Sequence, residues 1–219
     1  FTTCPVDNET WSVSANKIIL SQQEGWGETY GTTLRIYDTP VLYLPYFTFP
    51  INDQRKTGFL APQISSSNRF GLETVTPYYI NLAPNYDLTL TPRYMSEKGL
   101  QLQSEFRYLT STSQGLLGLE YLDSDDSDPQ LGNRYLYHWQ QQSYFNEQWR
   151  AGVDITNVSD DNYLTDLNSN YATKTDTHLA RSAILTHMGE RWRTDIQVQD
   201  YEVLGDHLES YTALPRIGF

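Results

Sequence analysis

Segments in which apolar and polar residues alternate recur along most of this chain and restrict the folds open to it. In residues 86–94 the apolar Tyr86, Leu88, Leu90 and Tyr94 alternate with Asp87, Thr89, Thr91 and Arg93. A period of two residues indicates a β-strand with one apolar and one polar face, and helical periodicity is nearly absent. We expect strands to start near residues 58, 72, 86, 100, 115, 134, 148, 177 and 191. This spacing leaves about ten residues for each strand, the length that a tilted strand needs to cross a membrane.

The connections between these segments are of two kinds. Those near 82–85, 110–114, 143–147 and 189–190 are short, whereas 123–131 and 159–177 are long and polar. Short turns on one side and longer loops on the other are typical of outer-membrane barrels. The acidic stretch 123–128 lacks the glycine and the terminal glutamate of an EF-hand loop, so we interpret it as a solvated loop rather than a calcium site.

Composition and motifs exclude several classes of function. The 219 residues include 15 Lys and Arg against 27 Asp and Glu, a net charge of −12, which argues against a nucleic-acid partner. The four histidines are scattered, and no metal-binding spacing, nucleophile elbow or phosphate loop is present. We therefore expect no enzyme activity, no catalytic residues, no metal and no cofactor. His138 and His187 are interpreted as ordinary lumen or loop histidines rather than as members of a hydrolase triad.

The first fifty residues follow a different pattern. Three strand candidates, 11–20, 26–37 and 41–49, are separated by polar turns, and the third is rich in apolar residues and prolines. We interpret residues 1–52 as the end of a separate β-domain and 53–219 as a second domain, with the charged stretch 52–58 as a hinge. The chain begins without a signal peptide, so we expect it to be a piece of a longer exported precursor. Cys4 is the only cysteine; it is a free or structural thiol or, more in keeping with export, has its partner elsewhere.

Three prolines lie fifteen residues apart in segments that otherwise indicate strands: Pro62, Pro77 and Pro92. Proline cannot donate a hydrogen bond to a sheet, so strands that carry it are loosely paired. With turns at 68–71 and 83–85, the three prolines would lie directly opposite one another in a single row across the sheet. The alternative is that two of them are strand-end prolines at a turn boundary.

Several motifs together resemble the LptD (OstA) family of lipopolysaccharide-assembly proteins of Gram-negative outer membranes. They are TTCP at 2–5, PVLYLPY at 40–46, RKTGFL at 55–60 and PNYDLTLTP at 84–92, with further agreement at 105–109 and 158–160. The resemblance covers essentially the whole chain. It implies an all-β protein, in which the end of a periplasmic β-jellyroll is followed by the first antiparallel strands of a large transmembrane β-barrel.

The resemblance also implies roles for individual residues. Pro62 and Pro77 match prolines of the family's lateral gate, and the spacing adds Pro92 to them. Cys4 matches a cysteine whose disulfide partner lies outside this chain. An apolar groove would carry the lipid, and simple core packing is the alternative for each of its candidates: Trp11, Val13, Ile18, Leu20, Leu34, Ile36, Leu42 and Leu44. Arg55 and Lys56 are candidates either for contact with lipid phosphates or for an interfacial anchor.

The function implied is transport of lipopolysaccharide and its insertion into the outer leaflet of the outer membrane, with the N-terminal segment in the periplasm. The implied partners are lipopolysaccharide, the lipoprotein plug LptE, the periplasmic LptA bridge and the barrel-assembly machinery. One alternative is a smaller outer-membrane porin or hydrolase barrel, which a terminal Phe219 favours. Pro215 argues against a regular final strand of that kind. A second alternative is a secreted β-sandwich that binds glycans.

Overall fold

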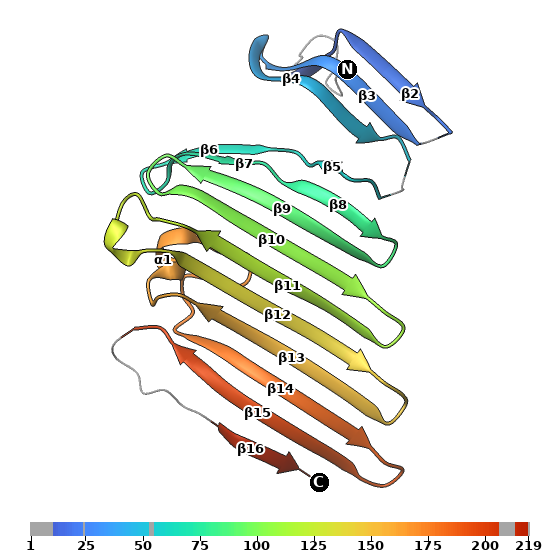
Figure 1. Cartoon of the computed structure of the whole chain (residues 1–219), viewed down its shortest axis with the longest axis vertical. Coiled ribbons are helices and arrows are strands. Elements are labelled where there is room, and N and C mark those ends of the chain that lie inside the picture. The colour runs from blue at the N-terminus through green and yellow to red at the C-terminus, as the bar shows by residue number, and fades with distance from the viewer. Residues whose placement is uncertain (1–10, 24, 53–54, 206–212, 219) are drawn as a thin grey trace. The chain divides into compact units, whose positions relative to one another are not determined.

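A computed structural model of the chain describes residues 11–23, 25–52, 55–205 and 213–218 (Figure 1). The chain packs into two compact units, which divide after residue 59. Both consist of antiparallel β-sheet, as the alternation predicts. The assignment of functional domains with a boundary after residue 52 stays a prediction.

The first unit is a small antiparallel sheet organised around one long strand. Its strands are β1 (Trp11–Ser14), β2 (Lys17–Ser21), β3 (Trp26–Ile36) and β4 (Thr39–Pro50). The short β5 (Gly58–Phe59) also falls within residues 1–59 but is not a strand of this sheet. Strand β3 pairs with β1 and β2 along one edge and with β4 along the other. The expected strand 11–20 is thus interrupted, because Gly31 of β3 has a left-handed φ of +62° and lies against the Asn16 side chain.

The second unit is one sheet in which most strands pair with the next strand in the chain. Its strands are β6 (Gln63–Ser67), β7 (Gly71–Val75), β8 (Tyr78–Ala83), β9 (Tyr86–Met95), β10 (Gly99–Leu109), β11 (Ser113–Leu122), β12 (Arg134–Tyr144), β13 (Trp149–Val158), β14 (His178–Met188), β15 (Arg193–Val203) and β16 (Ala213–Gly218). The order runs from β16 to β9, with β7 and β8 both pairing along β9 and β6 pairing with β7 (Figure 1).

The strand starts lie close to the positions predicted from the alternation, with two kinds of difference. The first two expected strands are each divided at a proline, so that Pro62 precedes β6 and Pro77 separates β7 from β8. The expectation that Pro215 prevents a regular final strand is wrong in part. Strand β16 forms around Pro215, and its register with β15 shifts between Gln197 and Gln199, which accommodates the missing donor.

The two faces of the second sheet have opposite chemistry. The register places the apolar positions of neighbouring strands on one face, where Leu100 is 60% exposed and Leu119 is 46% exposed. The other face carries polar and charged residues, among them the completely buried Gln101 and Glu120. It also carries a small buried apolar cluster, which includes Leu122 and Leu136 and packs against residues of α1 (Tyr163–Leu167) in the connection 159–177. A sheet of a water-soluble protein shows the reverse distribution.

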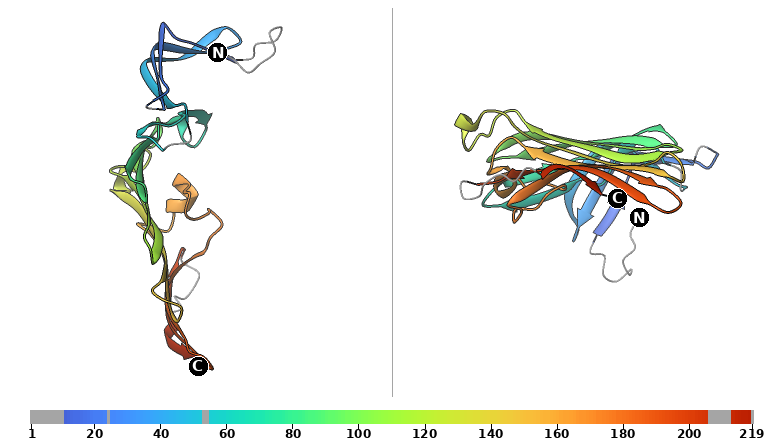
Figure 2. Two further views of the ribbon diagram at one scale, coloured as in Figure 1. Left: turned by 90° about the vertical axis from the view of Figure 1, so that its right-hand side faces the viewer. Right: turned by 90° about the horizontal axis from the view of Figure 1, so that it is seen from below.

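The connections confirm the predicted asymmetry. Tight turns join β8 to β9, β10 to β11, β12 to β13 and β14 to β15 at one end of the strands (Figure 1). The two long connections predicted, after β11 and after β13, lie at the other end, together with the short turns after β6 and β9. The longest of the described connections, 159–177, contains α1 (Tyr163–Leu167) and stands on one side of the sheet (Figure 2). We call residues 159–171 the inserted segment. No helix among the described residues is long and apolar enough to cross a membrane.

Candidate functional site: an apolar face, a proline break and a polar cavity

One face of the first sheet is apolar across all its main strands. Val13, Leu34 and Leu42 are directly paired across β1, β3 and β4, so their side chains form one row. Ile18 and Leu20 of β2 extend the same face and are 58% and 59% exposed. The face therefore offers a contiguous apolar surface that the described part of this unit covers only in part.

The predicted groove candidates fall on this face. Thr32, the partner of Leu44, lies two residues before Leu34 in β3, and Ile36 lies two residues after Leu34. The side chains of Leu44 and Ile36 therefore lie on the same face of the sheet as Leu34. For Trp11 the structure describes only the backbone, which pairs with Ile36. Their lipid-binding role stays a prediction.

Sequence reasoning missed two residues of the apolar face. Phe47 pairs with Thr29, and Phe49 packs so closely on Gly27 that a Cβ there would collide with its ring. The signal was present in the alternation of Phe47 and Phe49 along β4. The opposite face carries polar contacts such as Arg35 to Ser14, whose Nη1 and Oγ atoms are 2.6 Å apart.

The first strands of the second sheet are interrupted where the prolines lie. The Leu60 amide donates to the Pro77 carbonyl at 2.9 Å, and the Thr76 amide donates to the Pro92 carbonyl at 3.1 Å. In such a pair of antiparallel residues, the amide of each residue normally donates to the carbonyl of the other. Pro77 and Pro92 have no amide hydrogen, so the second hydrogen bond of each pair is missing. Two of the three prolines thus remove one ladder bond each beside the break.

The predicted single row of prolines is wrong. The first turn is one residue shorter than expected, since Ser67 pairs with Gly71, and this register puts Gln63 opposite Val75. A register shift between Asn81 and Ala83 then displaces β8 by one residue against β9. Pro92 consequently bonds with Thr76, not with Pro77.

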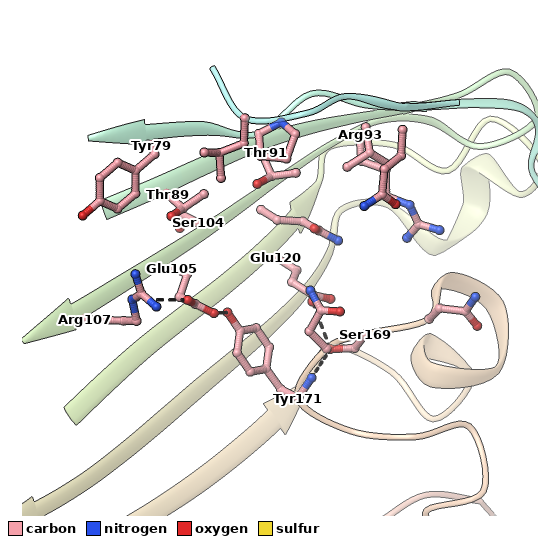
Figure 3. A pocket seen from close by; sticks show the side chains of 17 residues that line it. Tyr79, Thr89, Thr91, Arg93, Ser104, Glu105, Arg107, Glu120, Ser169 and Tyr171 are labelled. Atoms are coloured by element: carbon pink, nitrogen blue, oxygen red, sulfur yellow. Dashed lines mark hydrogen bonds and ion pairs between the residues drawn. The ribbon is translucent and has the colours of Figure 1, made fainter. Parts of the chain in front are cut away.

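A polar cavity of about 520 Å³ lies beside the break on the polar face of the sheet. Its wall combines residues next to the prolines with residues of the inserted segment (Figure 3). Hydroxyl and amide side chains dominate the lining: Gln63, Tyr79, Thr89, Thr91, Gln103, Ser104, Asn168, Ser169, Asn170 and Tyr171. Glu105, Arg107, Arg93 and Glu120 contribute the charges. Such a lining suits a hydroxyl-rich ligand better than an apolar one.

Hydrogen bonds fix the inserted segment above this cavity. The Tyr163 hydroxyl donates to Glu120 at 2.9 Å and accepts from Gln101 at 3.0 Å. Ser169 donates to the second Glu120 oxygen at 2.9 Å, and Tyr171 donates to Glu105 at 3.2 Å, as Figure 3 shows for the latter. Burial and the nearby carboxylates raise the pKa of both tyrosines, so the two hydroxyls stay protonated donors.

The acidic loop 123–128 is not simply solvated, in contrast to our interpretation from the sequence. Asp125 is completely buried and accepts hydrogen bonds from Lys98 at 3.1 Å and Arg134 at 2.9 Å. Burial alone would raise the pKa of the Asp125 carboxyl, but the hydrogen bonds from Ser127, Lys98 and Arg134 together lower it. Arg134 also binds Asp160 of the inserted segment at 2.8 Å.

The remaining predicted residues are not brought into this site. Cys4 lies outside the described residues. The Lys56 ammonium lies 4.7 Å from the centre of the Trp26 ring, in keeping with either proposed role. The role of Arg55 stays a prediction. Within the described ranges no cluster of three or more histidine, cysteine, aspartate or glutamate side chains could hold a metal ion.

Comparison with known proteins identifies similar sequences along the whole chain. The family model described as "LPS transport system D" matches residues 132–219. The LPS-assembly protein LptD of Pseudoalteromonas translucida (strain TAC 125) is 69% identical over 219 residues, 100% of this chain and 29% of the relative. LptD of Shewanella oneidensis is 46% identical over 220 residues, and LptD of Idiomarina loihiensis is 42% identical over 217 residues. The chain spans 29% of the length of each of these relatives.

Proposed function

Because the chain belongs to the LptD family of LPS-assembly proteins, we propose that it takes part in moving lipopolysaccharide into the outer leaflet of the Gram-negative outer membrane. The observation that carries this proposal is the break at Pro62 and Pro77. It lies near the edge of a sheet with one exposed apolar face and one polar face. An amphipathic lipid needs an exit of this kind, with an apolar side for its acyl chains and a polar side for its sugars. The matched family is described as a transport system, not as an enzyme family.

The second unit is proposed to be the first part of a β-barrel in the outer membrane. The exposed apolar face and the buried polar residues of its sheet support this, since lipid-facing positions of barrel strands are apolar and lumen-facing positions are polar. The edge strand β6 and its neighbours would then border the seam at which lipid leaves, with Pro62, Pro77 and Pro92 as the residues that weaken it. The cavity beside the break would face the lumen.

The first unit is proposed to be the periplasmic end of a jellyroll whose apolar face guides the acyl chains. The half-buried row of Val13, Leu34 and Leu42, beside the exposed Ile18 and Leu20, supports this. In this arrangement a periplasmic LptA bridge supplies the lipid, LptE plugs the barrel, and the barrel-assembly machinery inserts it. Cys4 is proposed to form a disulfide with a cysteine outside this chain.

Two alternatives are less well supported. In a small complete barrel the first and last strands would pair, whereas β6 and β16 lie at opposite edges of the described sheet. A secreted β-sandwich would bury its apolar faces between two sheets, but Leu100, Leu119 and their neighbours are exposed.

Photo-crosslinking in living cells tests the proposal. A photoreactive residue is placed at Leu42 on the apolar face or at Pro62 beside the break, and lipopolysaccharide adducts are detected. Tyr43 is the matched control for Leu42, because it is the next residue of β4 and its side chain points to the opposite face. Trp149 on the exposed face of β13 is a second control. We expect adducts at Leu42 and Pro62 only; equal labelling at Tyr43 and Trp149 would refute this route.

A further inference from the structure

The hairpin of β6 and β7 is held to the rest of its sheet unevenly. Strand β7 pairs with β9 at only three positions, from Glu73 to Val75. Beyond the proline end of β7, the Thr76 amide donates to β9. At the turn end the Ser96 amide donates to the Leu72 carbonyl at 3.0 Å and the Glu97 amide donates to the Phe70 carbonyl at 3.2 Å.

Arg93 joins the turn end of this hairpin to two other elements. Its Nε donates to Glu73 of β7 at 2.6 Å, while Nη1 donates to the Leu167 carbonyl at 2.8 Å and to Gln101 of β10 at 3.1 Å. The guanidinium also lies 4.7 Å from the centre of the Phe70 ring in the hairpin turn. Arg93 is 5% exposed, so these contacts are shielded from water.

The inserted segment is itself fixed to the middle of the sheet. Tyr163 is bound to Glu120, and Asp166 pairs with the fully buried Arg134 at 3.1 Å. Leu167 and Phe70 belong to the same buried apolar cluster. Arg93 therefore connects a weakly paired edge hairpin to a firmly held support.

We propose that Arg93 is a positioning residue that fixes the turn end of the β6–β7 hairpin to the inserted segment, so that the hairpin separates from the sheet only at its proline end. A single guanidinium suits this role, because its planar fork holds Glu73, Gln101 and Leu167 at once. A lysine would keep the charge but not this geometry. That the movement serves lipid release rests on the proposed function.

Amide hydrogen exchange in the intact protein tests the positioning role. Arg93→Gln removes the positive charge. Arg93→Lys keeps the charge and is the variant to measure if Arg93→Gln does not fold. The control is Arg193→Gln, which breaks an arginine–carboxylate pair with Asp195 of β15 and lies outside the lining of the cavity.

In Arg93→Gln we expect the Ser96 and Glu97 amides to exchange at least about tenfold faster, because charge-assisted hydrogen bonds of this kind are lost. Arg93→Lys should give an intermediate rate at both amides, and Arg193→Gln should leave both at the wild-type rate. Exchange at Thr76 should change less, because the proline end is already weakly held. Unchanged exchange at Ser96 and Glu97, or an equal acceleration at Thr76, would overturn the proposal.

A second measurement addresses release, namely entry of a large hydrophilic dye across the outer membrane of cells that carry each variant. Entry should rise for Arg93→Gln and stay at the wild-type level for Arg193→Gln. Altered exchange with unchanged dye entry would overturn the part in release. The proposed function would then still be judged separately by lipid adducts at Leu42.

Discussion

Replacing Pro77 with valine should tighten the break in the first strands. The Pro77 carbonyl already accepts the Leu60 amide at 2.9 Å, so an N–H at position 77 would point back toward the Leu60 carbonyl. One such bond contributes about 1 kcal/mol, which favours the paired state roughly fivefold. Valine also suits an extended backbone. Without the proline the unfolded chain has more conformations, which lowers the free energy of unfolding. This effect is the same for the paired and the separated folded states, so it does not change the ratio between them.

Two measurements check this prediction in the intact protein. The Leu60 amide should exchange more slowly in Pro77→Val, and newly made lipopolysaccharide should reach the cell surface more slowly. Pro84→Val is the matched control, because Pro84 lies in the turn after β8 and its replacement adds no donor at the break. Unchanged exchange at Leu60 would refute the pairing argument, and normal delivery despite slower exchange would refute the role of the break in release.

Three further predictions concern the inserted segment and the acidic loop. Arg134→Gln removes the fully buried cation that Asp125, Asp160 and Asp166 share, and should lower the free energy of unfolding by about 3–5 kcal/mol. Arg193→Gln, which breaks an exposed pair, should change it by less than about 1 kcal/mol in the same denaturant titration, and equal losses would contradict the argument. The lowered pKa of Asp125 means that its contribution is complete above the unfolded-state pKa of about 3.9 and is lost as the pH falls through the lower folded value. Acid titration should therefore destabilise the wild type below about pH 4, and Asp125→Asn should lack this component. A Cβ in Gly118→Ala would collide with the Tyr171 ring, so limited proteolysis should cleave residues 159–177 faster; wild-type cleavage rates would show that the ring is not held there.

Local sequence chemistry predicted the strands well because it depends on neighbours a few residues apart. The alternation around Leu88 and Leu90 places β9 and its two faces correctly, and short polar stretches mark the turns. The shared face of the groove candidates Leu42 and Leu44 was predictable for the same reason, since both follow the period of two in β4. The register of the prolines was not predictable. A single displaced residue between Asn81 and Ala83 changes every partner beyond it.

Sequence alone therefore determined that this chain forms antiparallel strands with one apolar and one polar face, because the period of alternation is a property of the backbone. Tertiary structure decided where the inserted segment lies, since the contacts of Tyr163 with Gln101 and Glu120 join residues far apart in the chain. It also decided that Asp125, in a loop of apparently solvated aspartates, is buried, because only the folded chain brings Arg134 and Lys98 to it. Charge pairing and register depend on distant partners, and no local pattern encodes them.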